Sequence, residues 1–173
     1  VTPRPESLQE DMLTASESPN RNPDRVFLHL RAAAESGWDF SSRWFMEPDN
    51  LDSIHTTDII PVDLNSLLYH LESTIAKSYR KLNRKKAARR FEYRAERRVQ
   101  AIMKYCWDDE SGCFVDFNFY TGKPTGVLSL AMVFPLYVGI ATVEQAAKVA
   151  ERLERDFLKS GGLVTTLNEN GQQ

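Results

Sequence analysis

The sequence predicts an all-α fold of paired helices with little β structure. Apolar residues recur at helical spacing in about five separate segments, and short turn signals join these segments. Alternation typical of strands is confined to residues 113–123, where it predicts a short β-hairpin-like insertion closing at Gly122. With 42% hydrophobic residues, the 173-residue chain can build a core of ordinary size.

The first expected helix runs from Asn22 to about Gly37. Asn22 can cap its N-terminus, Pro23 suits the first turn, and Gly37 is a natural end. One face of this helix carries Val26, Phe27, Leu30, Ala33 and Ala34. Asp39 should therefore lie just beyond the helix C-terminus, in a turn where its side chain can face a cleft.

The next two expected helices form an αα-hairpin. The first spans residues 61–82 and the second runs from about Ala88 to Tyr105, with a short basic connection between them. In the first, the apolar residues at the spacing of a buried stripe are Leu64, Leu67, Leu68, Leu71 and Ile75. We expect this stripe to be buried.

Two more helices are expected after the β-hairpin-like segment. They span residues 128–139 and 143–159, and Thr142 with Gln145 forms a capping box at the start of the second. Residues 160–173 carry turn signals and predict no final helix.

Charge is spread unevenly along the chain. Residues 1–63 hold twelve acidic residues against five Lys and Arg, whereas residues 77–98 hold eleven basic residues against two acidic ones. If the αα-hairpin buries its apolar stripes, the basic residues lie on its solvent-facing arc, where Glu92 and Glu96 can pair with neighbouring arginines. We therefore expect no nucleic-acid partner.

The sequence gives only weak signals about the compartment in which the protein is found. Cys106 and Cys113 are too few for a disulfide framework and favour a reducing compartment. The most apolar run, residues 127–140, is too short to cross a membrane and contains Pro135, so we expect buried core and no membrane partner. No signal peptide is recognisable at the start. We expect a cytoplasmic protein, with the periplasm as the alternative.

Asp39 is the candidate acid, in the stretch SGWDFSSRWF at residues 36–45. An acid desolvated by aromatic neighbours such as Trp38 and Phe40 has a raised pKa and can donate a proton near neutral pH. The structural alternative is that Asp39 caps the turn after Gly37 or forms an ion pair with Arg43. The residues alone favour this second reading.

Arg4, Pro5 and Glu6 form a compact guanidinium–carboxylate pair around a proline, which could hydrogen-bond vicinal hydroxyls of a sugar. An exposed ion pair is the commoner explanation of such residues.

The three histidines and two cysteines match no metal-ligand spacing, so we expect no metal.

Five blocks together resemble the central part of a bacterial trehalase. They are RPES (4–7), RAAAESGWDFSSRWF (31–45), IHTTDIIPVDLN (54–65), YCWDDESGCFVDFN (105–118) and ENGQQ (169–173). The resemblance implies that residues 1–173 are an internal piece of a single (α/α)6 toroid catalytic domain that lacks its N-terminal and C-terminal portions. It also implies hydrolysis of α,α-trehalose to two glucose molecules with inversion, without a cofactor.

The resemblance further assigns residues. It makes Asp39 the general acid, and it places Arg4, Pro5, Glu6 and Gly37 at the sugar-binding pocket. The family's general base is a glutamate beyond the end of this sequence, so we expect residues 1–173 to be inactive alone and the full-length enzyme to be a monomer. The family pattern has arginine at the position of His55, whose role is left open.

Two alternatives remain. A few pocket residues can change the sugar, so the same toroid could hydrolyse another α-glucoside. Alternatively, the chain could be a non-enzymatic helical interaction module whose basic αα-hairpin binds an acidic partner or nucleic acid. In that case Arg89, Arg90, Arg94 and Arg97 would carry the binding.

Overall fold

The computed structural model describes residues 1–168, which fall into two compact units. Unit 1 comprises Val1–Ile59 and the segment that begins at Thr165, and unit 2 comprises Ile60–Val164. Both units are mainly helical, and their strands are only two residues long. The all-α prediction is therefore confirmed.

The described residues of unit 1 form two helices and four short 3₁₀ turns. The helices are α1 (Leu8–Glu17) and α2 (Pro23–Glu35), and the turns are η1 (Pro5–Ser7), η2 (Ser42–Trp44), η3 (Leu51–Ser53) and η4 (Thr56–Asp58). Helix α2 is the predicted one, and the Asn22 side chain caps it by accepting a hydrogen bond from Asp24 N at 2.9 Å. Helix α1 was not predicted. Its two buried residues, Asp11 and Thr14, are polar, so it lacks the apolar stripe that reveals a helix.

The core of unit 1 lies between α2 and the irregular segment that follows it. It consists of Val26, Leu30, Ala33, Trp44, Phe45, Ile54 and Ile59. The half-buried rings of Trp38 and Phe40 pack against this core. The turn that carries Asp39 is therefore anchored on both sides.

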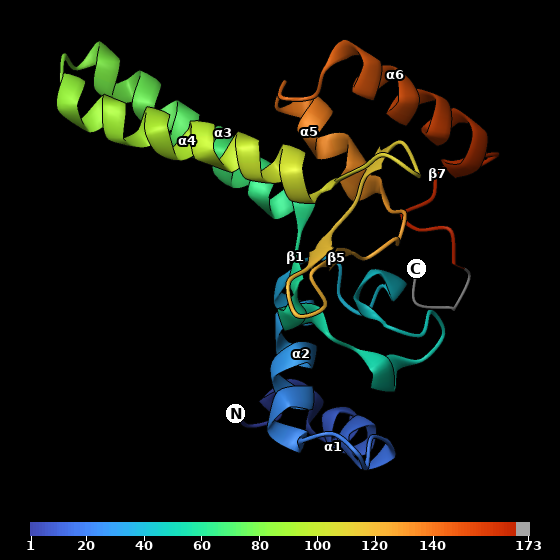
Figure 1. Ribbon diagram of the computed structural model, residues 1–173. Coiled ribbons are helices and arrows are strands. Elements are labelled where there is room, and N and C mark those ends of the chain that lie inside the picture. Colours follow the sequence, from blue (N-terminus) through green and yellow to red (C-terminus); the bar gives the residue numbers. More distant parts are fainter. Residues whose placement is uncertain (169–173) are drawn as a thin grey trace. The chain divides into compact units, whose positions relative to one another are not determined.

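Unit 2 is built on the predicted αα-hairpin of α3 (Val62–Lys81) and α4 (Lys85–Tyr105), which lie side by side along their length (Figure 1). Both predicted helices are confirmed. The connection between them is three residues long and passes through Asn83, whose φ is +55°. A left-handed residue at this position is the usual way to reverse the chain after a helix.

The expected buried stripe of α3 is wrong for three of its five residues, whereas Leu68 and Ile75 are half-buried. Leu64, Leu67 and Leu71 are 51%, 45% and 52% exposed, whereas the buried positions of α3 are Val62, Asp63, Ser66 and Ala76. Helix α3 packs against α4 and α5. Within residues 1–168, these three leucines therefore remain on the surface.

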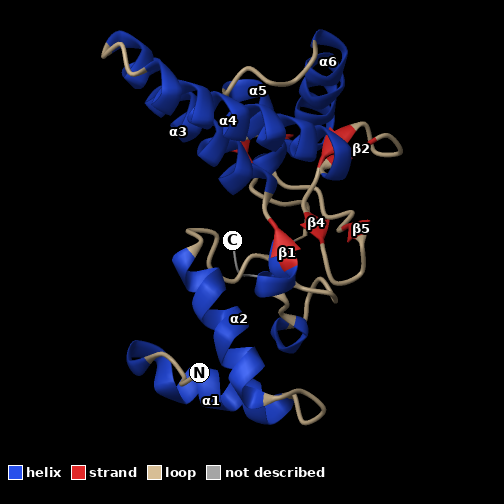
Figure 2. Ribbon diagram, turned by 60° about the vertical axis from the view of Figure 1, so that its left-hand side comes forward, coloured by secondary structure: helices blue, strands red, loops and turns tan. Residues whose placement is uncertain are grey.

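Short antiparallel strand pairs follow α4 (Figure 2). Strand β2 (Trp107–Asp108) pairs with β3 (Cys113–Phe114), and β4 (Phe117–Asn118) pairs with β5 (Lys123–Pro124). The β4–β5 turn passes through Gly122, whose φ of +71° suits glycine. The predicted hairpin is thus confirmed. Strand β1 (Ile59–Ile60) lies where the two units join along the chain.

The last helices are shorter than predicted. Residues 128–139 form a 3₁₀ turn, η5 (Leu130–Val133), and a single helical turn, α5 (Phe134–Tyr137). Helix α6 (Val143–Arg152) begins with the predicted capping box and widens into a π-helical turn, η6 (Leu153–Phe157). An unpredicted hairpin of β6 (Leu158–Lys159) and β7 (Gly162–Leu163) follows. In the described part of the chain, no helix is long and apolar enough to span a membrane.

Candidate active site

Asp39 lies at the tip of a tight turn directly after α2. Gly37 has a φ of +77° and ends the helical path. The Ser36 hydroxyl oxygen accepts a hydrogen bond from Trp38 N at 3.0 Å, and Trp38 O accepts one from Ser41 N at 3.0 Å. Asp39 itself is exposed and has a φ of +36°. The turn is thus closed by its neighbours, and among the described residues none pairs with the Asp39 carboxylate.

The aromatic residues beside Asp39 do not desolvate it within residues 1–168. Trp38 and Phe40 pack inward on the core of unit 1, while the carboxylate between them points to solvent. This arrangement corrects the expectation that the two rings dry the acid. Their role in unit 1 is to fix the two ends of the turn, because each ring is held in the core.

The Arg43 guanidinium is fully buried between two indole rings. Its Cζ lies 4.5 Å from the centroid of the Trp38 ring and 4.6 Å from that of Trp44. Stacking of this kind stabilises a buried cation. The structural alternative, in which Arg43 forms an ion pair with Asp39, is not what the structure shows.

Arg4 is buried and pairs with Asp11. Its Nη2 donates to Asp11 Oδ1 at 2.8 Å, its Nε lies 3.2 Å from both carboxylate oxygens, and its backbone N donates to Oδ2 at 2.8 Å. Pro5 and Glu6 are exposed, and Pro5 begins η1. The expected pair of Arg4 with Glu6 is therefore wrong, because the carboxylate that neutralises Arg4 comes from α1.

The structure brings the RPE segment to the Asp39 turn. The Arg4 Cζ lies 5.0 Å from the centroid of the Phe40 ring, next to Asp39 in the sequence. Asp11 is the functional candidate that sequence reasoning missed. Its only sequence signal is an acidic residue seven positions after Arg4, and this signal is ordinary.

His55 is a buried neutral histidine, as is His29 of α2. Burial lowers the pKa of both, and that of His29 falls to about 4. The Nδ1 of His29 accepts a hydrogen bond from Thr57 N at 3.1 Å and lies 2.9 Å from Thr57 Oγ1. His55 N donates to Trp44 O at 2.9 Å. The His29 side chain therefore holds η4, the segment before β1, in place. No metal-binding cluster occurs among residues 1–168.

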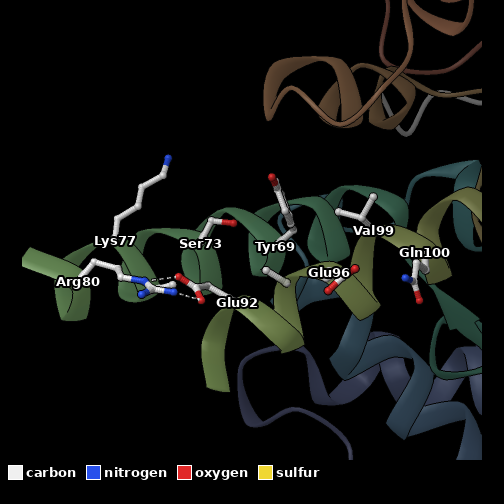
Figure 3. A pocket seen from close by; sticks show the side chains of 10 residues that line it. Tyr69, Ser73, Lys77, Arg80, Glu92, Glu96, Val99 and Gln100 are labelled. Carbon is white, nitrogen blue, oxygen red and sulfur yellow. Dashed lines mark hydrogen bonds and ion pairs between the residues drawn. The ribbon is translucent and has the colours of Figure 1, made fainter. Parts of the chain in front are cut away.

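A groove of about 460 Å³ lies in unit 2 between α3 and α4, where Tyr69, Ser73 and Lys77 point to the same side of the helix pair (Figure 3). Two glutamates, Glu92 and Glu96, line it, and Glu92 accepts hydrogen bonds from Arg80 at 2.6 and 2.7 Å. These bonds lower the pKa of Glu92, so its carboxylate is a poor proton donor. Glu92 is therefore not a candidate general acid.

The basic segment of the αα-hairpin is partly neutralised from within unit 2. Besides the Arg80–Glu92 pair, Arg98 donates two hydrogen bonds to Glu72, at 2.9 and 3.0 Å, and a third to Asn65 at 2.8 Å. Glu92 pairs with an arginine, as expected, but the arginine belongs to the facing helix.

Known proteins similar to this chain are trehalases. It is 44% identical over 172 residues to the periplasmic trehalase of Salmonella paratyphi B and 42% identical to that of Escherichia coli O1:K1. Each alignment covers 99% of this chain and 30% of the relative. The neutral trehalase Nth1 from Saccharomyces cerevisiae has a similar structure, with a TM-score of 0.70 and 32% identity over 84% of this chain and 27% of the yeast chain.

These comparisons bear on fold and compartment. The yeast likeness supports the prediction that the helices are part of an (α/α)6 toroid. The expectation of a cytoplasmic protein is wrong, because the bacterial relatives are named periplasmic trehalases and point to the periplasm. The chain spans about a third of the length of these relatives.

Four of the five blocks that resemble a trehalase lie in the described part of the chain, and the ENGQQ block at 169–173 lies outside it. The trehalase family model matches the sequence from residue 1 to residue 173. The chain belongs to the trehalase family.

Proposed function

We propose that the protein containing these residues hydrolyses α,α-trehalose to two glucose molecules with inversion, and that Asp39 is its general acid. The observation that carries this proposal is the Asp39 turn. Its carboxylate is exposed and unpaired within residues 1–168, while the rings on either side are anchored in the core. A fixed backbone with an accessible carboxyl group is what proton transfer to a bound substrate requires.

In the proposed mechanism, protonated Asp39 donates its proton to the glycosidic oxygen as the bond to the anomeric carbon breaks. A water molecule attacks that carbon from the opposite face, which inverts its configuration. Arg4, Pro5, Glu6 and Gly37 line the pocket for the sugar, and the Arg4 guanidinium can donate to its hydroxyl oxygens.

The water needs a general base about 6.5 to 9.5 Å from the acid. Asp11 cannot serve, because it is buried and tied to Arg4. We infer that the base comes from outside these 173 residues, which form part of a single toroid catalytic domain and are inactive alone. The exposed leucines of α3 and the 30% coverage of the relatives support this inference.

The test is glucose release from trehalose by the full reading frame that contains this sequence, compared between the unmodified protein and Asp39→Asn. Asparagine cannot donate the proton, so kcat should fall by about a hundredfold to ten-thousandfold while the fold is kept. The matched control is Glu35→Gln, which removes an exposed carboxylate from the end of α2 and should leave kcat unchanged.

Unchanged turnover in Asp39→Asn would remove Asp39 from the mechanism. Glucose release from maltose but not from trehalose would keep the acid and change the substrate to another α-glucoside. Activity of residues 1–173 alone would contradict the assignment of the base to another part of the protein.

A further inference from the structure

We propose that Asp11 is a positioning residue, which aims the guanidinium of Arg4 at the bound sugar. This inference rests on the proposed function, because Arg4 is taken to bind substrate. Asp11 touches neither the sugar nor the reacting atoms in this proposal, and it acts only through Arg4.

The contact between the two residues is buried and two-sided. Arg4 is 8% exposed and Asp11 is 1% exposed. Nε and Nη2 of Arg4 donate to the Asp11 carboxylate, which fixes the plane of the guanidinium. The backbone N of Arg4 also donates to Asp11, so the side chain and the main chain of Arg4 are held by one carboxylate.

One edge of the guanidinium stays available. Within residues 1–168, no hydrogen bond engages Nη1 of Arg4, which carries two N–H donors. Because Asp11 occupies the opposite edge, rotation of the guanidinium is blocked and these donors keep one direction. A planar, charged donor pair held in this way suits the hydroxyl oxygens of a sugar.

Two further contacts connect Arg4 to its surroundings in unit 1. Its guanidinium lies over the Phe40 ring, beside Asp39. Arg31 of α2 donates to Thr2 O at 3.1 Å, which fastens the segment before Arg4 independently of Asp11. Loss of the Asp11 carboxylate should therefore release the guanidinium more than the segment that carries it.

The experiment measures KM and kcat for trehalose in the full reading frame, for the unmodified protein, Asp11→Asn and the control Glu10→Gln. Asparagine keeps the size of the side chain but loses its charge and one acceptor. We expect KM to rise about ten- to hundredfold, the range for hydrogen bonds to charged groups, with a smaller change in kcat. Glu10 is the exposed neighbour of Asp11 on α1, so Glu10→Gln should match the unmodified protein.

A double-mutant comparison separates positioning from general stability. Arg4→Met should raise KM. The double variant Arg4→Met with Asp11→Asn should have the same KM as Arg4→Met alone, because Asp11 no longer has a guanidinium to orient. A merely structural Asp11 would lower the melting temperature and leave KM unchanged. Additive effects of the two substitutions on KM would overturn the proposal.

A further variant covers the case in which Asp11→Asn does not fold. Asp11→Glu keeps the charge but moves the carboxylate by one methylene, so it should displace the guanidinium and raise KM. An unchanged KM in a folded Asp11→Glu or Asp11→Asn protein would overturn the role of Asp11 alone. Failure of the unmodified protein to release glucose would overturn the proposed function and, with it, this inference.

Discussion

The two units hold their chains in different ways. Unit 1 places its candidate site on turns and fixes them with buried polar and charged groups, such as the Arg4–Asp11 pair, Arg43 between two indoles, and His29 against Thr57. Unit 2 is built on two long helices whose ion pairs lie nearer the surface. Buried polar groups are costly unless they are fully paired, so they tolerate little change.

This contrast indicates that the two units have different roles. Irregular backbone can aim a carboxylate such as Asp39 or a guanidinium such as Arg4, whereas regular helices provide a stable frame. We therefore expect substitutions in unit 1 to affect both stability and catalysis, and those along the helix pair of unit 2 to affect stability mildly.

The largest expected effect on stability comes from truncating a side chain in the core of unit 1, against which the Asp39 turn packs. Leu30 on α2 is 1% exposed, and Leu30→Ala should lower the free energy of unfolding by about 2–5 kcal/mol. The matched control is Leu28→Ala on the same helix, where the leucine is 40% exposed and the loss should be much smaller. Urea unfolding measures both variants, and equal losses would mean that the core of unit 1 is not where the structure places it.

The next effect is a loss of stability in acid that originates in unit 1. Burial lowers the pKa of His29 to about 4; Arg21, Arg25 and His55 act in the same direction, and Asp58 opposes them. The unfolded state therefore takes up a proton first. The contribution of His29 is present above pH 6.5, and about 3 kcal/mol of it should be lost as the pH falls to 4.

Unfolding curves at pH 7 and pH 4 measure this loss. His29→Gln should weaken the dependence of stability on pH, whereas His70→Gln, at an exposed position of α3, should preserve it. If His29→Gln and the unmodified protein showed the same pH dependence, the loss of stability in acid would come from protonation of other groups.

The smallest effects are expected in the helix pair of unit 2. Glu72→Gln weakens a partly buried pair with Arg98, and it should cost about 1 kcal/mol. Glu92→Gln weakens the exposed pair with Arg80, and it should change the melting temperature less than Glu72→Gln does. Thermal unfolding in low and high salt measures both, and a larger loss for Glu92→Gln would reverse the expected order.

The same contrast explains what the sequence predicts well. Helices α2, α3 and α4 were predicted because apolar residues recur along them at helical spacing. Helix α1 was missed because it buries Asp11 and Thr14. The β6–β7 hairpin was missed because residues 158–163 lack the aromatic, alternating pattern that marks residues 113–123. Periodicity also predicts that Leu64, Leu67 and Leu71 share a face, but it does not say what covers that face.

The candidate site follows the same pattern. The position of Asp39 just after a helix was predicted from Gly37, since a left-handed glycine commonly ends a helix. The partner of Arg4 was not predictable, because Asp11 reaches it through the packing of α1 and leaves no local motif. The inward orientation of Trp38 and Phe40 likewise depends on the tertiary core.

The left-handed backbone of Asp39 limits which side chains can replace it. At a φ of +36°, asparagine, aspartate and glycine are tolerated, while β-branched residues clash with their own main chain. Replacing Asp39 with valine or threonine would therefore distort the turn and remove the carboxyl group at once, so the two effects on activity could not be separated. Asparagine is the substitution that keeps the turn, so under the proposed function Asp39→Asn is the variant suited to capturing the intact disaccharide in a crystal.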